Sequence, residues 1–269
     1  MRHKKLTYGI IGTAAVWCVF TYLFAYQDDQ TIQSVRPQVS RANAAILDHL
    51  SLSFPNPAFV KASTDVLKEA GFTVDYYEGK DVTVELYRAL PAHGYDLILL
   101  RVHSAYIDKA GTLAMFSGEP YSKERYVYEQ LRNRIACGFI EPYQKGDPRY
   151  LAITDEFVRH SMNGMFDNTV IVMMGCFGIK RSSATAFLEK GAKVYIGWDG
   201  AVSASHTDQA TIQLLKHLLI DKETVGKAVA QTMNKVGWEP QYKSSLLFWP
   251  IRAQNYTVQR PDNCNMAIQ

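Results

Sequence analysis

The feature that most constrains the fold is a set of short, uninterrupted apolar runs separated by helical patterns. YDLILLRV (95–102), NTVIVMMG (168–175) and KVYIGW (193–198) have the length of strands, and their centres carry no charged residue. A strand with one face in solvent alternates polar and apolar residues, whereas a parallel strand covered on both faces does not. These runs predict a mostly parallel sheet with helices on both faces.

The segments between these runs have helical spacing. NPAFVKASTDVLKEAG (56–71) places apolar residues on one helical face and ends at a glycine, a common helix stop. Further helices are predicted in SSATAFLEKG, HTDQATIQLLKHLLI and KETVGKAVAQTMNKV, and further strands in residues 44–54 and in FTVDYYEG. Strand–helix–strand order implies right-handed crossovers, so we expect an α/β three-layer sandwich with a mostly parallel central sheet. This domain spans 41–269 and carries an irregular insertion at about 104–168, with a helix near Lys123 to Ile135.

Composition excludes several classes of protein. The 269 residues carry a formal net charge of only +3, and no run of five or more basic residues occurs, which argues against a nucleic-acid partner. Neither a CxxC pair nor an HExxH motif is present, so we expect no metal of those common types. No cofactor is expected either.

The N-terminus predicts a membrane anchor. Residues 6–26 contain no charge, and as a helix they would span roughly 31 Å, about the thickness of a bilayer's hydrocarbon core. Basic residues occupy the tail at 1–5, whereas Asp28 and Asp29 follow the apolar segment. Because positive charge stays on the cytoplasmic side, we expect a single-pass protein with a cytoplasmic N-terminus and an extracytoplasmic main domain. Residues 27–40 would be a tether. A cleaved signal peptide is the alternative, and it would have a shorter apolar core and small residues at a cleavage site.

The four cysteines follow from that topology. Cys18 lies in the anchor, while Cys137, Cys176 and Cys264 would lie in an oxidising compartment. Because three is an odd number, at least one of them should be unpaired within the chain or paired with another chain.

Two reactive side chains follow apolar strand runs directly. His103 comes after DLILLRV, and Cys176 comes after VIVMMG. The carboxyl ends of parallel strands meet at one edge of a sheet, where ligands bind, and neighbouring strands lie about 4.8 Å apart. Both residues also have structural interpretations, because free cysteine commonly packs as a small hydrophobe and a histidine at a strand end can cap a loop.

The pairing of a thiol with an imidazole suits nucleophilic catalysis. The thiolate is the reactive form, and a neighbouring imidazole can take the thiol proton and later protonate a leaving amine. A helix beginning near Arg181 would add a positive dipole end, and Gly175 and Gly178 would allow a tight turn around the cysteine.

Three blocks of the sequence, in order, resemble the caspase-like superfamily of cysteine peptidases. They are LILLRVHS, VIVMMGC and FLEKGAKVYIGWDGAVS, and the likeness covers roughly Phe72 to Val236. That superfamily includes caspases, legumains, gingipains, clostripain, separases and bacterial CHAT domains. In it, an apolar strand ends in His-Gly, and a later apolar strand ends just before the catalytic cysteine.

The resemblance implies roles for individual residues. His103 would be the general base and acid and Cys176 the nucleophile, with the backbone N–H groups of Ser104 and Cys176 as the oxyanion hole. Trp198 and Asp199 match a placement that binds a basic side chain, which implies cleavage after Arg or Lys. Asp199 also fits an ordinary turn residue in Asp-Gly. The partner implied is a peptide or protein substrate.

One residue departs from the pattern. Ser104 stands where the family usually has glycine, and a serine would impair the site if the position needs a positive φ or room for substrate. The sequence therefore predicts a membrane-anchored cysteine endopeptidase with a His-Cys dyad. A catalytically inactive binding or sensor module held at the membrane is the alternative.

Overall fold

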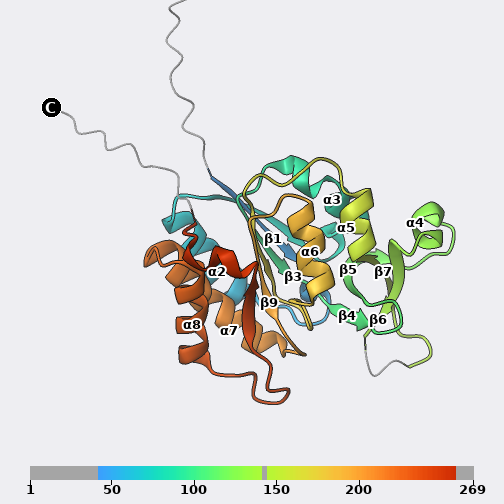
Figure 1. Cartoon of the computed structure of the whole chain (residues 1–269). Helices are drawn as coiled ribbons and strands as arrows, with labels where there is room; N and C mark the ends of the chain where they lie inside the picture. Colours follow the sequence, from blue (N-terminus) through green and yellow to red (C-terminus); the bar gives the residue numbers. More distant parts are fainter. Residues whose placement is uncertain (1–41, 141–143, 259–269) are drawn as a thin grey trace, which may run out of the picture. The chain divides into compact units, whose positions relative to one another are not determined.

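The computed structural model describes residues 42–140 and 144–258 and contains a six-stranded sheet with the strand order β10-β9-β8-β3-β1-β2 (Figure 1). All of its strand pairs are parallel except β9–β10. The predicted mostly parallel sheet is therefore confirmed, and the antiparallel edge strand β10 is an addition to it. The strands are β1 (Asn43–Asp48), β2 (Thr73–Glu78), β3 (Leu97–Arg101), β8 (Val170–Met173), β9 (Val194–Trp198) and β10 (Leu246–Trp249).

Helices cover both faces of this sheet. Alternate residues of β3 pack into two separate apolar cores: Leu97 and Leu99 contact one, and Ile98 and Leu100 contact the other. This is why the run shows no polar alternation. The first core includes α2 (Pro57–Glu69), α7 (Ala204–Leu215) and α8 (Val225–Val236); the second includes α3 (Val84–Ala89), α5 (Asp155–Ser161) and α6 (Arg181–Glu189).

The helix predicted at 56–71 shows how local sequence sets its limits. The Asn56 side chain accepts a hydrogen bond from the Phe59 N–H at 3.1 Å. Pro57 occupies the first turn, where a backbone N–H would have no partner within the helix, so the missing N–H of proline costs nothing. The helix ends before Gly71, which has a φ of +93°. The prediction of this helix is confirmed.

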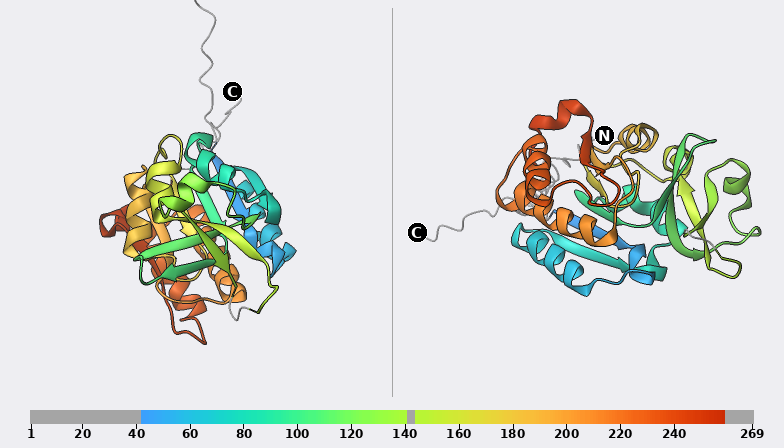
Figure 2. Two further views of the ribbon diagram at one scale, coloured as in Figure 1. Left: turned by 90° about the vertical axis from the view of Figure 1, so that its right-hand side faces the viewer. Right: turned by 90° about the horizontal axis from the view of Figure 1, so that it is seen from below.

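The insertion is more regular than predicted. It forms an antiparallel sheet in the order β4-β5-β7-β6, seen beside the main sheet in Figure 1 and Figure 2. The predicted helix from Lys123 to Ile135 was wrong in its extent, because only α4 (Val127–Leu131) is helical and Ile135 already belongs to a strand. The strands are β4 (Ser104–Ile107), β5 (Thr112–Pro120), β6 (Ile135–Phe139) and β7 (Arg149–Thr154).

The predicted anchor at 6–26 and tether at 27–40 lie outside the described residues. Within 42–140 and 144–258, no helix has both the length and the apolar character needed to cross a membrane.

A buried arginine joins three elements at the carboxyl end of the sheet. Arg101, the last residue of β3, is 0% exposed. Its Nη1 lies 2.6 Å from Asp48 Oδ1 at the end of β1, and its Nε lies 2.8 Å from Asp208 Oδ1 in α7. Its Nη2 donates to Asp208 Oδ2 and to the Phe54 carbonyl, each at 2.9 Å. Two acidic partners and a backbone acceptor therefore compensate the burial of this charge.

The first prediction concerns this cluster. Arg101→Met would leave two buried carboxylates without their cation, so the free energy of unfolding should fall by about 3–5 kcal/mol. The measurement is chemical denaturation of the full-length chain. Lys61→Met is the control, because the Lys61–Asp65 pair is exposed and its loss should change the free energy by less than about 1 kcal/mol. Equal effects of the two substitutions would contradict the assigned role of Arg101.

Candidate functional site

His103 and Cys176 follow neighbouring strands at equivalent positions. β3 and β8 pair in parallel from Leu97–Val170 to Leu100–Met173, and each reactive residue lies three residues beyond that last pair. The Ser104 hydroxyl bridges the two chain segments by donating to the Cys176 carbonyl at 2.7 Å. The sheet register thus brings His103 and Cys176 to the same edge of the sheet.

Both side chains line one cavity of about 410 Å³. Its walls come from five places: the turn after β1, the segment after β3, the segment after β8, the chain from β9 into α7, and the loop between α8 and β10. The lining residues are Leu50, Phe54, Val102, His103, Ser104, Met174, Gly175, Cys176, Ala201, Val202, Ser203, Ala204, Ser205, Thr207 and Tyr242.

The Cys176 thiol is held by the backbone of Val202. The Val202 N–H donates to Sγ at 3.4 Å, and the thiol donates to the Val202 carbonyl at 3.6 Å. Burial raises the pKa of the thiol; the Val202 hydrogen bond offsets part of that rise, and the negative charge of Glu239 adds to it. The thiol is therefore protonated at neutral pH.

The His103 ring is held by the turn after β1. Its Nε2 lies 2.9 Å from Ser53 Oγ, and its ring centroid lies 5.9 Å from that of Phe54 and 5.6 Å from that of His49. Burial, followed by the positive charge of Arg101, lowers the pKa of His103 to about 4. The imidazole is thus neutral at pH 7 and able to accept a proton.

The two reactive groups line the same cavity, but their hydrogen bonds are made to other residues. In the part of the chain that the structure describes, the thiol bonds to Val202 and the ring to Ser53. Catalytic hydrogen bonds in ligand-free enzymes are often formed only when substrate arrives. In this arrangement both groups are neutral at pH 7, and each is bonded to a different residue.

Ser53 was missed from the sequence. It lies just past the 3₁₀ turn η1 (His49–Leu52), inside the segment 44–54 that was predicted as a strand region. Once β1 is known to end at Asp48 and to pair with β3, a hydroxyl in the following turn is brought to the edge that carries His103. The two serines of LSLS (50–53) were the only signal in the sequence.

The turn predicted around Cys176 is present, but its glycines do not supply the left-handed conformation. Neither Gly175 nor Gly178 has a positive φ, and the left-handed residue is Phe177, with a φ of +57°. Gly175 is needed for close approach instead, because a Cβ there would lie 2.6 Å from the Val102 carbonyl oxygen. A Cβ on Gly178 would lie 2.7 Å from Met173 Cγ. The turn at Cys176 therefore stores its backbone strain in a non-glycine residue.

Ser104 replaces the glycine of the family pattern without backbone strain. Its φ is not positive, so the backbone conformation suits a serine. Its side chain contacts the Cys176 carbonyl as well as lining the cavity. The oxyanion-hole role of the Ser104 and Cys176 N–H groups stays a prediction.

Trp198 and Asp199 do not reach the cavity. Trp198 is 1% exposed, and its Nε1 donates to Thr207 Oγ1 at 3.0 Å. Asp199 accepts a hydrogen bond from the Ser245 N–H at 2.8 Å, which ties β9 to β10. Neither residue lines the cavity that holds the thiol, so their predicted contact with a basic substrate side chain has no geometric support.

Metal-binding side chains and the remaining cysteines are the last features of the sequence to compare with the structure. Within the described ranges, no group of three or more His, Cys, Asp or Glu residues could hold a metal ion. Cys137 and Cys176 are both free thiols, while Cys18 and Cys264 lie outside these ranges.

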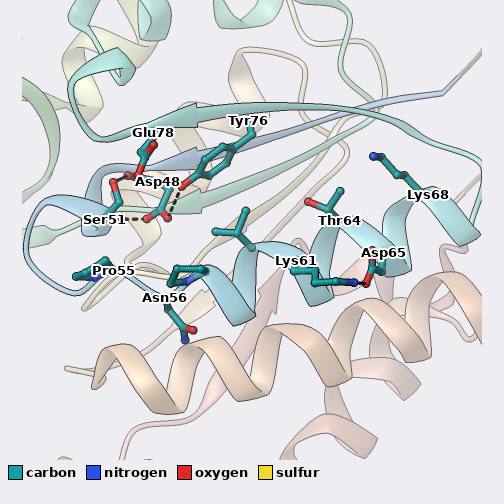
Figure 3. A pocket seen from close by; sticks show the side chains of 12 residues that line it. Asp48, Ser51, Pro55, Asn56, Lys61, Thr64, Asp65, Lys68, Tyr76 and Glu78 are labelled. Atoms are coloured by element: carbon teal, nitrogen blue, oxygen red, sulfur yellow. Dashed lines mark hydrogen bonds and ion pairs between the residues drawn. The ribbon is translucent and has the colours of Figure 1, made fainter.

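A second cavity, of about 440 Å³, lies between α2 and β2 (Figure 3). Asp48 lines it and accepts hydrogen bonds from the Tyr76 hydroxyl at 3.2 Å and from the Ser51 N–H at 3.0 Å. No thiol or imidazole is among its lining side chains. The candidate chemistry therefore belongs to the cavity of His103 and Cys176.

Comparison with known proteins does not assign the chain to a family. No model of a protein family matches the chain, and no curated protein matches its sequence.

The second prediction follows from the two pKa shifts. Because the thiol is neutral and the imidazole does not become charged until about pH 4, there is no thiolate–imidazolium pair at pH 5–8 in the free protein. Alkylation of Cys176 by iodoacetamide should therefore accelerate steadily with pH, close to tenfold per pH unit, up to at least pH 9. Peptide mapping by mass spectrometry measures the rate at each pH. A rate that is flat between pH 5 and 8 would instead reveal a preformed ion pair.

The third prediction concerns His49, which is 0% exposed and whose ring nitrogens have no hydrogen-bond partner among the described residues. Burial, followed by the neighbouring His103, lowers the pKa of His49 from 6.5 to about 3. Between those values the unfolded chain binds a proton that the folded chain does not, so stability is full above pH 6.5 and decreases as the pH falls toward 3.

His49→Phe keeps an aromatic ring in this position and removes the titration. Urea denaturation between pH 7 and 4 should show a smaller loss of unfolding free energy in this variant than in the wild type. His160→Phe is the control, because His160 is exposed. An unchanged pH dependence in His49→Phe would refute the argument.

Proposed function

We propose that the chain is a cysteine endopeptidase of the caspase-like type, with Cys176 as the nucleophile and His103 as the general base and acid. The observation that supports this most is that both side chains line one cavity at the tips of adjacent parallel strands. Unrelated structural cysteines and histidines have no reason to meet at the ligand-binding edge of a sheet.

In the proposed reaction, Cys176 must first leave Val202. Rotation about its Cα–Cβ bond would free Sγ, and an incoming peptide would compete for the Val202 backbone groups. If the Ser53 hydroxyl accepts from the Nε2–H of His103, Nδ1 is left as the basic nitrogen. Ser53 would then act as a positioning residue, because it fixes the tautomer and the orientation of the ring.

The bond changes follow from this arrangement. His103 takes the thiol proton as Sγ attacks the carbonyl carbon of the scissile bond, and the carbonyl oxygen becomes an oxyanion facing the Ser104 and Cys176 N–H groups. The imidazolium then protonates the departing amine, and the C–N bond breaks. Water attacks the resulting thioester with His103 again as the base, which releases the acid and restores the thiol.

We also propose that residues 6–26 anchor the domain to a membrane, with the domain on the extracytoplasmic side. The support is the charge-free stretch of that length with basic residues before it and acidic residues after it.

A noncatalytic binding module is the second candidate. It is favoured by the separate hydrogen bonds of the thiol and the ring, both of which stabilise the unreactive neutral forms. The same cavity would then bind a peptide without cleaving it. Turnover separates the two candidates.

The fourth prediction tests the proposed function with the full-length chain in detergent and a mixed library of quenched fluorogenic peptides. Cys176→Ser and His103→Ala should each lower kcat/KM by about a thousandfold or more, because they remove the nucleophile and the base. Ser53→Ala should lower kcat by about tenfold with little change in KM, as expected for a group that orients the base.

Cys137→Ser is the matched control, because Cys137 is the other free thiol among the described residues and does not line the cavity. It should retain wild-type activity. Absence of cleavage, together with unchanged reactivity of Cys176 in His103→Ala, would favour the noncatalytic module.

A further inference from the structure

The cavity that holds the dyad has uncharged walls. Apart from His103 and Cys176, its lining consists of apolar side chains, glycine and hydroxyl groups, and none of the described lining residues is Asp, Glu, Lys or Arg. A substrate side chain that enters it would therefore find no formal charge to pair with. His103 itself supplies none at neutral pH, because burial and the charge of Arg101 lower its pKa to about 4.

Two carboxylates near the cavity are already engaged. Asp208, on α7, is 3% exposed and is held by Arg101 and by the Asn56 side chain, whose Nδ2 lies 2.8 Å from Oδ2. Asp199 accepts from the Ser245 N–H and lies outside the cavity. Asp208 cannot bind a substrate cation without giving up a structural contact, and Asp199, although exposed, does not line the cavity.

Glu239 is the carboxylate whose charge reaches the thiol, and its acceptor sites are filled. It is 2% exposed, and its Oε2 accepts from the backbone N–H groups of Gln241 at 2.8 Å and Tyr242 at 2.6 Å. Ser203 supplies further hydrogen bonds from its side chain and its backbone. A carboxylate offers about four lone-pair sites, so this set of donors leaves no site for a cation. Glu239 acts as the structural centre of the loop that supports the cavity wall.

We propose that this cavity accepts an uncharged, mainly apolar substrate side chain next to the scissile bond, in place of the Arg or Lys that the family resemblance implies. This inference rests on the proposed function. A cation placed here would lose its hydration and gain no charged partner, whereas an aliphatic chain of the same length would contact Leu50, Phe54 and Val202. An acidic side chain is disfavoured for the same reason.

The test uses peptidyl acyloxymethyl ketones, which alkylate an active-site cysteine, in a matched pair. One carries norleucine next to the reactive carbonyl and the other carries lysine, which differs by the terminal ammonium group. With full-length protein, the rate of Cys176 labelling by the norleucine probe should exceed that of the lysine probe by more than about tenfold. Mass spectrometry of the Cys176 peptide measures both rates.

Two substitutions of one lining residue control for differences in intrinsic reactivity between the two probes. Ser205 lines the cavity, is exposed, and lies in the first turn of α7, where a carboxylate is well tolerated. Ser205→Asp should narrow or invert the norleucine-to-lysine ratio, whereas Ser205→Asn, of nearly equal size and without charge, should preserve it.

The outcomes separate the two claims. A norleucine preference that Ser205→Asp lowers or inverts, and that Ser205→Asn preserves, supports the inference. Lysine labelling equal to or faster than norleucine labelling in the wild type overturns the inference and leaves the peptidase intact. Failure of both probes to label Cys176, while iodoacetamide at pH 9 does label it, overturns the proposed function and this inference with it.

Discussion

The buried ion cluster around Arg101 is the constraint on which the candidate site depends. The guanidinium bonds at once to the end of β1 through Asp48, to α7 through Asp208 and to the Phe54 carbonyl. Those partners belong to elements that form walls of the cavity, and His103 lies two residues beyond Arg101 itself. Because an unpaired charge is so costly at this depth, each wall can be in place only when the others are. The cluster therefore holds the walls of the cavity rigidly in position.

Burial sets the protonation of His103 and Cys176, and two nearby charges add to its effect. The positive charge of Arg101 opposes a second positive charge on His103, and the negative charge of Glu239 opposes a thiolate at Cys176. The resting site is consequently neutral, with the thiol on Val202 and the ring on Ser53. An enzyme built in this way would form its reactive ion pair only with substrate bound, when water is excluded and the Val202 backbone is occupied. This arrangement would protect a free thiol from oxidation in an oxidising compartment.

The main sheet and the position of the dyad could be predicted from the sequence because they depend on one local signal. Runs such as LILL and VIVM are apolar throughout, and the residues that follow them must lie at the same edge of a parallel sheet. The insertion could not be predicted in the same way. Its central pair, β5–β7, joins residues that are distant in sequence, such as Ala114 and Thr154, and β5 is buried along nearly its whole length, so no alternating pattern was present. The roles of Ser53 and Arg101 also depended on tertiary contacts, because a serine in a turn and an arginine in an apolar run have no distinctive local pattern.

The most direct test of the account is a crystal structure of the chain after reaction with a peptide aldehyde ending in norleucine. The account predicts a covalent bond from Cys176 Sγ to the aldehyde carbon, the thiol displaced from Val202, and the His103 ring within hydrogen-bonding distance of the new tetrahedral centre. An unmodified Cys176 still bonded to Val202, with the peptide bound elsewhere or absent, would contradict the central claim that this thiol and this imidazole act together.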